Sequence, residues 1–357
     1  MNRWSKESWK KYKIFQHPGW NNDAVLNDTK TQLMQNPPLV FIDEIKLLKK
    51  RLTMVHSGEY FIIQGGDCAE TFSDFNAELI KNKLSILLQM SIVLSYGTSL
   101  KTIRIGRMAG QFAKPRTRLT ELYNNISFPS YRGDAINSIT CSKSSRSPDP
   151  KRMLTAYQQS ANTMNLIRSI INAGYTKLSN AQQWDLDFIK KSHQSKKYHA
   201  ITNKIQHALS FIESVEDNSK ISEDLKLYEF YTSHEGLLLE YEQALTRYNP
   251  INKKYYDQSG HMIWVGDRTR SITSAHIEFV SGIENPIGIK VGPTIDKDEL
   301  IEIIHKINPK NELGKVLLII RLGTENINNI LPGLIKNVTK NNLNVIWLCD
   351  PMHGNTY

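Results

Sequence analysis

The sequence predicts an α/β fold of the (β/α)8 TIM-barrel type, in which seven of the eight strands are recognisable. From residue 60 onward, short apolar or β-branched segments alternate with helical patterns, and this alternation is typical of βα units. Most of these segments are apolar at nearly every position, as parallel strands covered on both faces are. Each is followed by a polar, Gly-containing loop rich in Arg, Asp, Glu or His, and the active site of a barrel is built from such loops. A doubly wound sheet is the alternative, but its ligand-binding loops gather at one switch point.

The expected strands are short, and helical segments separate them. Strands are expected at residues 60–64, 102–106, 227–231, 262–266, 287–291, 316–320 and 344–348. Helices are expected at residues 77–94, 156–171, 235–248 and 298–307. Because the sequence contains no further strand pattern between the seventh strand and Tyr357, we expect an incomplete barrel.

Two parts of the chain fall outside this repeat. Residues 1–57 are expected to form an N-terminal extension with a helix around 41–54, and residues 58–357 are expected to form the barrel. Within the barrel, residues 178–224 are longer than a simple crossover requires, so we expect an inserted helical pair there. That insertion serves either subunit contact or regulation, or packing alone. Residues 137–150 contain many Ser and two Pro and are expected to form an exposed loop.

The net charge of +10 raises the question of a nucleic-acid partner. The Lys residues are scattered through the chain, however, and the sequence has no basic arm, zinc finger or RNA-binding signature. We therefore expect no nucleic-acid binding, and we expect the substrate to be an anionic small molecule.

The composition is that of a soluble globular protein, with 40% hydrophobic and 22% charged residues. No run of 18 apolar residues is present, so no transmembrane helix and no membrane partner are expected. The polar residues 1–10 lack the apolar core of a secretory signal, and we expect a cytoplasmic location. The three cysteines, Cys68, Cys141 and Cys349, are widely spaced, which indicates no disulfide framework and fits a reducing compartment.

Six motifs occur in order along the chain, most of them in loops that follow expected strands. They are Gln-Gly-Gly-Asp-Cys-Ala-Glu (64–70), Gly-Arg-Met-Ala-Gly-Gln-Phe-Ala-Lys-Pro-Arg (106–116), Pro-Ser-Tyr-Arg-Gly-Asp (129–134), Ser-His-Glu-Gly-Leu (233–237), Lys-Val-Gly-Pro (290–293) and Cys-Asp-Pro-Met-His-Gly-Asn-Thr (349–356). In order and spacing they match the class II (plant-type) 3-deoxy-D-arabino-heptulosonate 7-phosphate (DAHP) synthases. The chain resembles this family over nearly its whole length. Any one motif would be a weak signal, but six in order are specific.

The resemblance implies a reaction and a set of ligands. The family carries out the metal-dependent condensation of phosphoenolpyruvate with D-erythrose 4-phosphate to DAHP plus phosphate, which opens the shikimate pathway of aromatic amino-acid biosynthesis. The enol carbon of phosphoenolpyruvate attacks the sugar aldehyde, and this step requires a Lewis acid and cationic groups for two phosphates and a carboxylate. The resemblance also implies a homo-oligomer and leaves open an aromatic amino acid as an effector.

Cys68 and His353 lie in motifs from which the family binds a divalent metal ion. A thiolate and an imidazole suit Mn, Co, Fe or Zn better than Mg alone. Taken by itself, a Cys after an apolar strand is more often a small buried hydrophobe, and a His in a loop is more often merely hydrogen-bonded. Because both residues follow expected strands and lie in matched motifs, we expect them to be metal ligands. Cys349 is expected to belong to its strand, and Cys141 to have no role.

Cationic residues from several strand ends match the family's substrate-binding positions. The positions around the phosphoenolpyruvate carboxylate and phosphate are matched by Arg107, Arg268, Lys290 and Arg321, and those around the phosphate of erythrose 4-phosphate by Lys114, Arg116 and Thr117. Lys290 within Ile-Gly-Ile-Lys-Val would be costly to bury without an anionic partner, which is either a substrate or a structural carboxylate. The Lys-Pro-Arg segment has a second interpretation as a solvated basic loop.

Lys290, Asp67 and Glu235 are the candidate catalytic residues. Asp67 and Glu235 are expected near the aldehyde and the metal ion, or behind them as orienting groups, and neither is assigned as general acid or base. Asp267 is also expected at the phosphoenolpyruvate site, although the family carries the longer Glu before the Arg that Arg268 matches. The string Arg132-Gly-Asp134 resembles an adhesion motif, and we interpret it as a coincidence.

The family's other metal ligands, a Glu and an Asp, follow the motif of His353, whereas every acidic residue of this chain precedes His353. With fewer ligands, metal affinity is expected to fall sharply. We therefore expect a truncated chain that shows no synthase turnover by itself with added Mn²⁺ or Co²⁺. Two alternatives stay open: a catalytically inactive fragment or assembly partner of the family, and a homologue that condenses phosphoenolpyruvate with another aldose phosphate.

Overall fold

The centre of the molecule is a single parallel sheet. The computed structural model describes residues 4–175, 191–215 and 229–355. Seven strands follow one another across the sheet in sequence order, and every pair is parallel. The strands are β1 (Tyr60–Gly66), β2 (Lys101–Arg107), β5 (Phe230–Glu235), β8 (Met262–Val265), β9 (Ile287–Val291), β10 (Val316–Ile320) and β11 (Ile346–Cys349).

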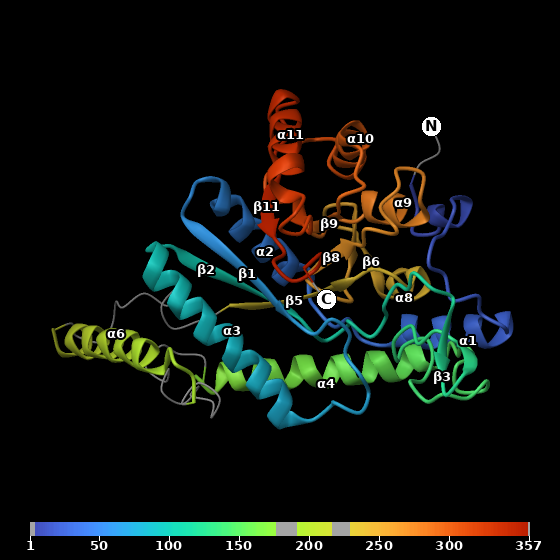
Figure 1. The fold of residues 1–357 in the computed structure, drawn as a ribbon, viewed down its shortest axis with the longest axis horizontal. Helices are drawn as coiled ribbons and strands as arrows, with labels where there is room; N and C mark the ends of the chain where they lie inside the picture. Colours follow the sequence, from blue (N-terminus) through green and yellow to red (C-terminus); the bar gives the residue numbers. More distant parts are fainter. Residues whose placement is uncertain (1–3, 176–190, 216–228, 356–357) are drawn as a thin grey trace.

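The sheet curls into a nearly closed barrel with helices on its outside (Figure 1). In the part of the chain that the structure describes, β1 pairs only with β2 and β11 only with β10, so the seam lies between the first and last strands. The predicted barrel type with seven strands is therefore confirmed. Because all seven strands point the same way, their C-terminal ends lie at one rim.

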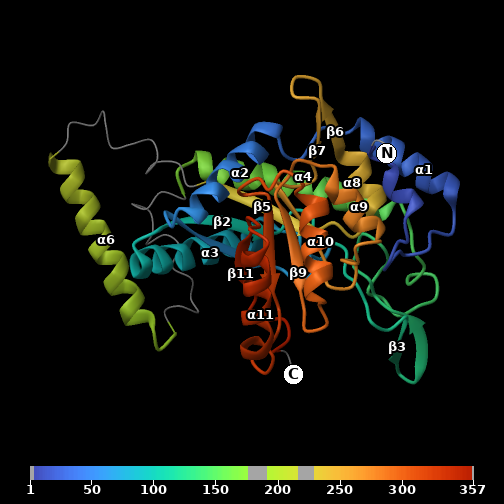
Figure 2. The ribbon, with the colours of Figure 1, turned by 90° about the horizontal axis from the view of Figure 1, so that it is seen from above.

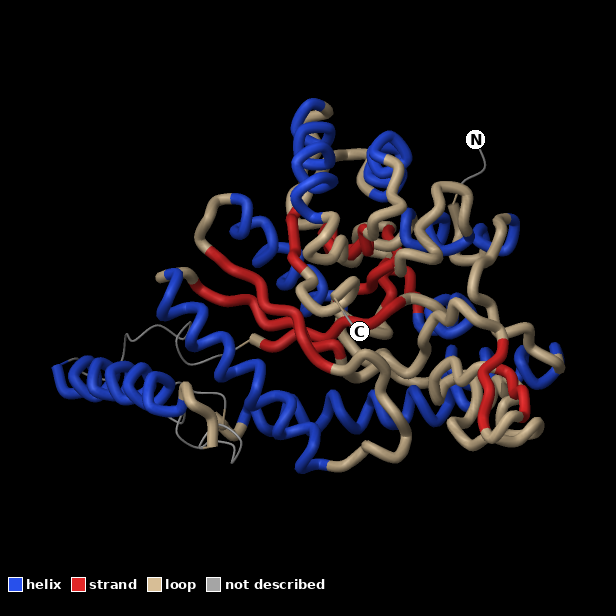
Figure 3. Tube along the Cα trace, viewed as in Figure 1, coloured by secondary structure: helices blue, strands red, loops and turns tan. Residues whose placement is uncertain are grey.

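Helices surround the strands on most sides, as Figures 2 and 3 show. They are the 3₁₀ helix η1 (Ser8–Lys11) and the α-helices α1 (Asp23–Gln35), α2 (Ile42–His56), α3 (Ala77–Thr98), α4 (Arg152–Asn172), α6 (Ser195–Val215), α8 (Leu239–Leu245), α9 (Ala275–Ser281), α10 (Lys297–Ile307) and α11 (Ile327–Lys340). Two antiparallel hairpins lie outside the barrel, β3 (Thr120–Tyr123) with β4 (Ile126–Pro129) and β6 (Thr246–Asn249) with β7 (Lys254–Asp257). Figure 2 shows β3 projecting from the body of the molecule.

Both faces of the sheet are buried along β5, β8, β9 and β10, whereas the edge strands β1 and β11 are partly exposed. Alternate strand residues, among them Ile105, Trp264 and Ile319, form one apolar cluster with Leu48 and Leu52 of α2. The intervening residues of β8, β9 and β10 belong to a second cluster, together with α9, α10 and α11. A strand buried on both faces has no position that water can solvate, which explains the nearly continuous apolar segments in the sequence.

Some elements differ from those predicted. The helix expected at 235–248 is confined to α8, and the chain then turns into β6. Residues 246–249 pair antiparallel with β7, so their backbone hydrogen bonds are made across the hairpin instead of along a helix. β5 runs from Phe230 to Glu235, and residues 227–228 of the expected strand lie outside the described residues. The two hairpins and the helices α1, α9 and α11 were not predicted.

The N-terminal extension expected at residues 1–57 packs against the barrel where it is described. Trp9 belongs to the cluster under α9, α10 and α11, Leu33 to a cluster with α4 and α8, and Leu48 to the barrel interior. Much of the insertion expected at 178–224 lies outside the described residues, and the structure describes its helix α6. The division of the chain into these parts stays a prediction. None of the described helices is both long enough and apolar enough to cross a membrane.

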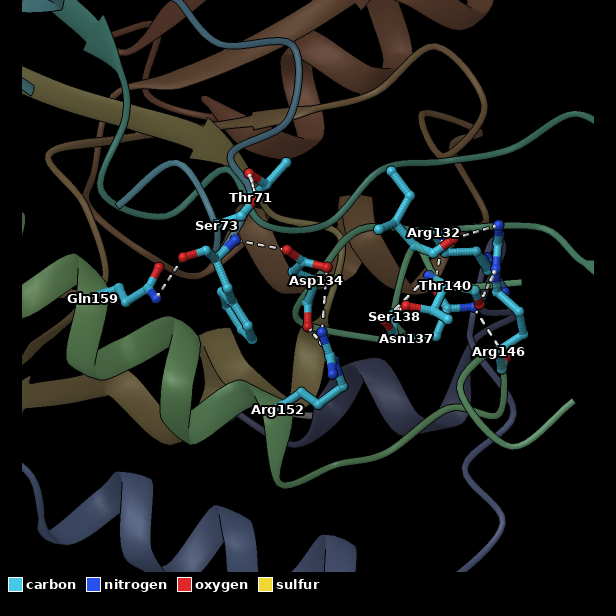
Figure 4. Close-up of polar contacts among 12 residues, drawn as sticks. Thr71, Ser73, Arg132, Asp134, Asn137, Ser138, Thr140, Arg146, Arg152 and Gln159 are labelled. Carbon is cyan, nitrogen blue, oxygen red and sulfur yellow. Dashed lines mark hydrogen bonds and ion pairs between the residues drawn. The ribbon is translucent and has the colours of Figure 1, made fainter. Parts of the chain in front are cut away.

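The loop at residues 137–150 was expected to be exposed, but the side chains of Asn137 and Arg146 are buried. The prediction of exposure was wrong for these two residues. Arg146 is 2% exposed, and its guanidinium donates to the carbonyl oxygens of Thr140 and Ile139. The buried amide of Asn137 donates to the carbonyl of Arg146, as Figure 4 shows. These hydrogen bonds close the Ser-rich segment on itself. Two others, from Asn137 to the carbonyl of Ser130 and from Arg146 to the carbonyl of Pro129, join it to the end of β4.

Asp134 ties the same region to the segment that follows β1. Its carboxylate accepts the Phe72 N–H at 2.6 Å and a guanidinium N–H of Arg152 at 3.2 Å (Figure 4). Asp134 is buried, and the guanidinium of Arg132 donates to the carbonyl of His17 at 2.9 Å. The side chains of residues 132 and 134 are thus hydrogen-bonded to other parts of the protein. This agrees with the interpretation of residues 132–134 as a coincidental match to an adhesion motif.

Gly133 provides a test of this anchoring. Its φ is +100°, and an added Cβ would overlap the carbonyl oxygen of Phe112. We predict that Gly133→Ala lowers the free energy of unfolding by about 1–3 kcal/mol or more, measured by thermal or urea unfolding. Gly97→Ala in α3 is the matched control, because nothing lies within 4 Å of its added Cβ and Ala favours a helix. Equal thermal midpoints for the two variants would contradict the prediction.

Candidate active site

The rim formed by the C-terminal strand ends carries all of the predicted site residues. Arg107 and Glu235 are the last residues of β2 and β5, and Lys290 is the last but one of β9. The others lie in the loops that follow β1 (Asp67 and Cys68), β2 (Lys114, Arg116 and Thr117), β8 (Asp267 and Arg268), β10 (Arg321) and β11 (His353). Seven separate segments of the chain therefore contribute to one surface.

The side chains of Cys68 and His353 lie close enough to change each other's pKa through a hydrogen bond, although one residue follows the first strand of the barrel and the other follows the last. This hydrogen bond, helped by the positive charges of Lys114 and Arg107 and opposed by burial, lowers the pKa of Cys68 to about 7. Hydrogen bonds with Asp350 and with Cys68 raise the pKa of His353. The structure thus brings together the two residues predicted to be metal ligands.

Asp350 lies between the predicted metal-binding and substrate-binding groups. Its carboxylate accepts the Lys290 ammonium at 2.5 Å and the Nδ1 of His353 at 2.8 Å. Burial would raise the pKa of Asp350, but the hydrogen bonds from His353 and Lys290 prevail and hold it well below its usual range. The sequence analysis gave Asp350 no role. Its position directly after the last strand, inside a matched motif, could have identified it as a candidate site residue.

Lys290 has the anionic partner that its buried position requires. Its side chain is 9% exposed and that of Asp350 is 10% exposed. Burial lowers the pKa of Lys290, and Asp350 opposes this shift. Of the two expected partners, a substrate or a structural carboxylate, the structure shows the carboxylate.

Glu235 is a buried carboxyl group among cations. Its Oε1 is buried and has no hydrogen-bond partner in the described part of the chain. Burial raises the pKa of Glu235 to about 7, against the opposing charges of Lys290 and Arg107. Gly266 makes room for it, because a Cβ at that position would overlap Oε1. The carboxyl group thus changes its protonation state near neutral pH.

Arg107 lies with its guanidinium over the ring of Trp264, at 4.8 Å from the ring centroid. Its Nε is buried and lacks a hydrogen-bond partner within the described residues. The charge of Arg107 acts on Cys68, Glu235 and Lys290. A cation held in place by stacking, with an N–H still free, is suited to an anionic ligand.

Asp267 connects three strand ends. One of its oxygens accepts Arg270 Nε at 2.9 Å and the Gly292 N–H at 3.1 Å, and the other accepts Arg321 Nη1 at 2.8 Å. The short side chain fits because Gly292 has no Cβ, which would overlap its carboxylate. Asp267 therefore orients Arg321, and Arg270 is a further buried cation that sequence reasoning missed.

The loop after β2 meets the loop after β8. Arg268 Nη2 donates to Thr117 Oγ1 at 2.6 Å, so two residues predicted to bind different substrates are direct neighbours. Lys114 lies close enough to Cys68 for its charge to act on the thiol. Arg116 Nε donates to the carbonyl of Tyr131 at 2.5 Å, which fixes this guanidinium to the protein.

Asp67 is turned to a different partner from the other candidates. Its carboxylate forms an ion pair with Lys83 of α3, and its N–H donates to the carbonyl of Arg107. Its role near the aldehyde stays a prediction. Glu70, which sequence reasoning left without a role, accepts the N–H groups of residues 109, 110 and 111 at 3.0, 2.9 and 2.7 Å. It thereby fixes the loop after β2 that carries the predicted cations.

Comparison with known proteins decides the family. A model of the class-II DAHP synthetase family matches residues 4–357. The chain belongs to this family. The prediction of family membership is confirmed, whereas the prediction of a truncated chain is not borne out.

Three relatives share the name phospho-2-dehydro-3-deoxyheptonate aldolase. The protein of Streptomyces coelicolor is 41% identical over 350 residues, which are 98% of this chain and 77% of that relative. The protein of Neurospora crassa is 40% identical over 99% of this chain and 76% of its own length. The protein of Mycolicibacterium smegmatis is 38% identical over 96% of this chain and 73% of its own length. This family member thus resembles bacterial and fungal relatives to a similar degree.

The thiolate character of Cys68 is testable in metal-free protein. Because its pKa is lowered to about 7, the thiolate is present above about pH 7 and is lost as pH falls through that value. We predict that iodoacetamide labels Cys68 with a midpoint near pH 7, measured by peptide mass spectrometry in the presence of a chelator. His353→Gln should move the midpoint upward by about one unit or more, since an ordinary thiol titrates near 8.5.

His305→Gln is the control for that substitution, because His305 is exposed on α10. It should leave the labelling midpoint of Cys68 unchanged. Identical midpoints in the unmodified protein and in His353→Gln would show that the imidazole does not act on the thiol.

Proposed function

We propose that this chain condenses phosphoenolpyruvate with D-erythrose 4-phosphate to give DAHP and inorganic phosphate, the first step of the shikimate pathway. The observation that carries the proposal is the meeting of Cys68, His353 and several cations at one rim of the barrel. Membership of the class-II DAHP synthetase family supports the same reaction. The substrates carry two phosphates and a carboxylate, so a site for them needs several fixed cations.

Phosphoenolpyruvate is assigned to Lys290, Arg107 and Arg321, at the ends of β9, β2 and β10. Lys290 supplies a compact buried charge, whereas Arg107 and Arg321 supply planar guanidinium groups for a carboxylate or phosphate. Each of the three is held by a separate group of the protein, namely Asp350, Trp264 and Asp267. A site preorganised in this way binds anions without first ordering long side chains.

Erythrose 4-phosphate is assigned to the loop after β2. Lys114, Arg116 and Thr117 lie on this loop, and the contact between Thr117 and Arg268 joins it to the loop after β8. An aldose bound there would have its phosphate at the outer part of the rim and its aldehyde toward Cys68 and Glu235. Proximity of this kind supplies much of the rate in a two-substrate reaction.

Cys68 and His353 are the residues that would hold the divalent metal ion. The pair fits such an ion, because the thiol is readily ionised and the imidazole is oriented by Asp350 through Nδ1. Across residues 4–175, 191–215 and 229–355, no three His, Cys, Asp or Glu side chains form a metal-binding group. When bound, an ion of the Mn, Co, Fe or Zn class would polarise the aldehyde oxygen as a Lewis acid.

Glu235 is the residue that we assign to proton transfer. When the enol carbon attacks the aldehyde, the aldehyde oxygen becomes a hydroxyl group and needs a proton. Water must then add to C2 of phosphoenolpyruvate, and the C–O bond from C2 to the phosphate group breaks, so that phosphate leaves and the 2-keto group of DAHP forms. A carboxyl group with a pKa of about 7 is protonated in a large fraction of molecules at neutral pH, and its free Oε1 can donate. The surrounding cations then retain the anionic substrates while the proton moves.

The direct experiment is turnover by the purified chain with phosphoenolpyruvate, erythrose 4-phosphate and Mn²⁺. Phosphate release and DAHP formation in equal amounts are the expected result. This replaces the expectation of no turnover, because the truncation on which that expectation rested is not borne out. Ribose 5-phosphate and arabinose 5-phosphate in the same assay test the alternative of another aldose phosphate. Failure of every aldose, in protein that is folded by circular dichroism, would overturn the proposed function. A homo-oligomer, an aromatic amino-acid effector and a cytoplasmic location stay predictions.

Lys290→Gln is predicted to lower kcat/KM for phosphoenolpyruvate by about 30-fold to 1,000-fold, because a charged contact to an anion contributes about 2–4 kcal/mol. The measurement is steady-state phosphate release at fixed erythrose 4-phosphate. Lys50→Gln is the matched control, since Lys50 is exposed on α2, away from the rim. A kcat/KM for Lys290→Gln within threefold of the control would contradict the assignment.

A further inference from the structure

The two carboxylate oxygens of Asp350 accept hydrogen bonds from different kinds of donor, Oδ1 from backbone N–H groups and Oδ2 from side chains. Oδ1 accepts the backbone N–H groups of Met352 and His353, both at 3.1 Å, and so shapes the turn after β11. Oδ2 accepts the Lys290 ammonium at 2.5 Å and the His353 Nδ1 at 2.8 Å. One oxygen atom is therefore shared by a substrate-binding group and a metal-binding group.

Sharing one acceptor makes the two hydrogen bonds compete. A carboxylate oxygen that accepts two strong donors polarises each of them less than it would polarise one alone. Lys290 and Asp350 are both nearly buried, so water cannot readily replace either partner. Within the described residues, Asp350 is the one hydrogen-bond acceptor that the Lys290 ammonium has.

We propose that Asp350 is a positioning residue that couples occupation of the phosphoenolpyruvate site to metal affinity by sharing its Oδ2 between Lys290 and His353. This inference rests on the proposed function. When the phosphate or carboxylate of phosphoenolpyruvate draws the ammonium away, Oδ2 is left to His353 alone. The stronger hydrogen bond at Nδ1 would then raise the basicity of Nε2, so that Nε2 binds a metal ion more tightly. Carboxylates that accept from metal-binding imidazoles have this effect in general.

The coupling has a definite sign. Phosphoenolpyruvate raises the affinity of the site for the metal ion, and by linkage the metal ion raises the affinity for phosphoenolpyruvate by the same factor. A coupling free energy of ordinary size corresponds to a change of about 5-fold to 150-fold. Asp350 acts in this coupling through Lys290 and His353, the two side chains that its Oδ2 contacts.

The test measures Co²⁺ binding by the absorption of the Cys68 thiolate–Co²⁺ bond, with and without phosphoenolpyruvate and without turnover. In the unmodified protein, phosphoenolpyruvate should tighten Co²⁺ binding by at least about fivefold. In Asp350→Asn, the amide oxygen can still accept the two backbone N–H groups, but its NH₂ cannot accept from Lys290 or His353. This variant should bind Co²⁺ about 10-fold to 100-fold more weakly and should show no effect of phosphoenolpyruvate.

Lys290→Met gives a second, opposite expectation, because the methionine side chain has no N–H to donate. Removal of the donor leaves Oδ2 to His353 at all times, so Co²⁺ binding without phosphoenolpyruvate should become as tight as that of the unmodified protein with it. A purely structural role of the ion pair predicts weaker binding instead. If Asp350→Asn does not fold, this second variant still tests the proposal by itself.

Asp43→Asn, on the exposed face of α2, is the matched control and should behave as the unmodified protein does. The inference is overturned if the unmodified protein binds Co²⁺ and phosphoenolpyruvate but neither variant changes Co²⁺ affinity or its response to phosphoenolpyruvate. If the unmodified protein binds neither ligand, the proposed function fails first, and the inference fails with it. The two failures are thus distinguishable in one set of titrations.

Discussion

The parallel direction of the seven strands is the constraint on which the rest of the structure depends. It places every C-terminal strand end at one rim, so that the side chains of Cys68 after β1 and His353 after β11 lie close together. The same direction requires crossover helices on the outer face and a filled interior. Leu48 and Leu52 of α2 help to fill that interior, which makes the N-terminal segment part of the barrel's packing.

Charges gathered at one rim would repel one another and lose hydration unless they were paired. The structure meets this condition with shared carboxylates: Asp350 holds Lys290 and His353, and Asp267 holds Arg321 and Arg270. Each ion pair fixes a cation in one orientation, although its net contribution to stability is small once desolvation is included. The pairs therefore contribute mainly to the geometry of the site.

Two buried polar atoms at the rim lack a hydrogen-bond partner in the described part of the chain, Glu235 Oε1 and Arg107 Nε. Unsatisfied buried groups are costly, and their usual explanation is a ligand or a catalytic role. Both lie beside Lys290 and within reach of the charge of Cys68. The unpaired atoms and the paired cations together mark the part of the rim where substrates are expected to bind.

The sequence by itself determined the barrel type, because strands buried on both faces leave a nearly continuous apolar pattern; β9 and β10 were predicted with their observed bounds. Its motifs also pointed to Cys68 and His353. The hairpins and short helices escaped prediction because their patterns are brief and ambiguous. Only the tertiary structure decided that Lys290 would meet Asp350, which lies 60 positions away. Residue type predicts that a buried cation needs an anion, but the loop that supplies it depends on how distant strand ends converge.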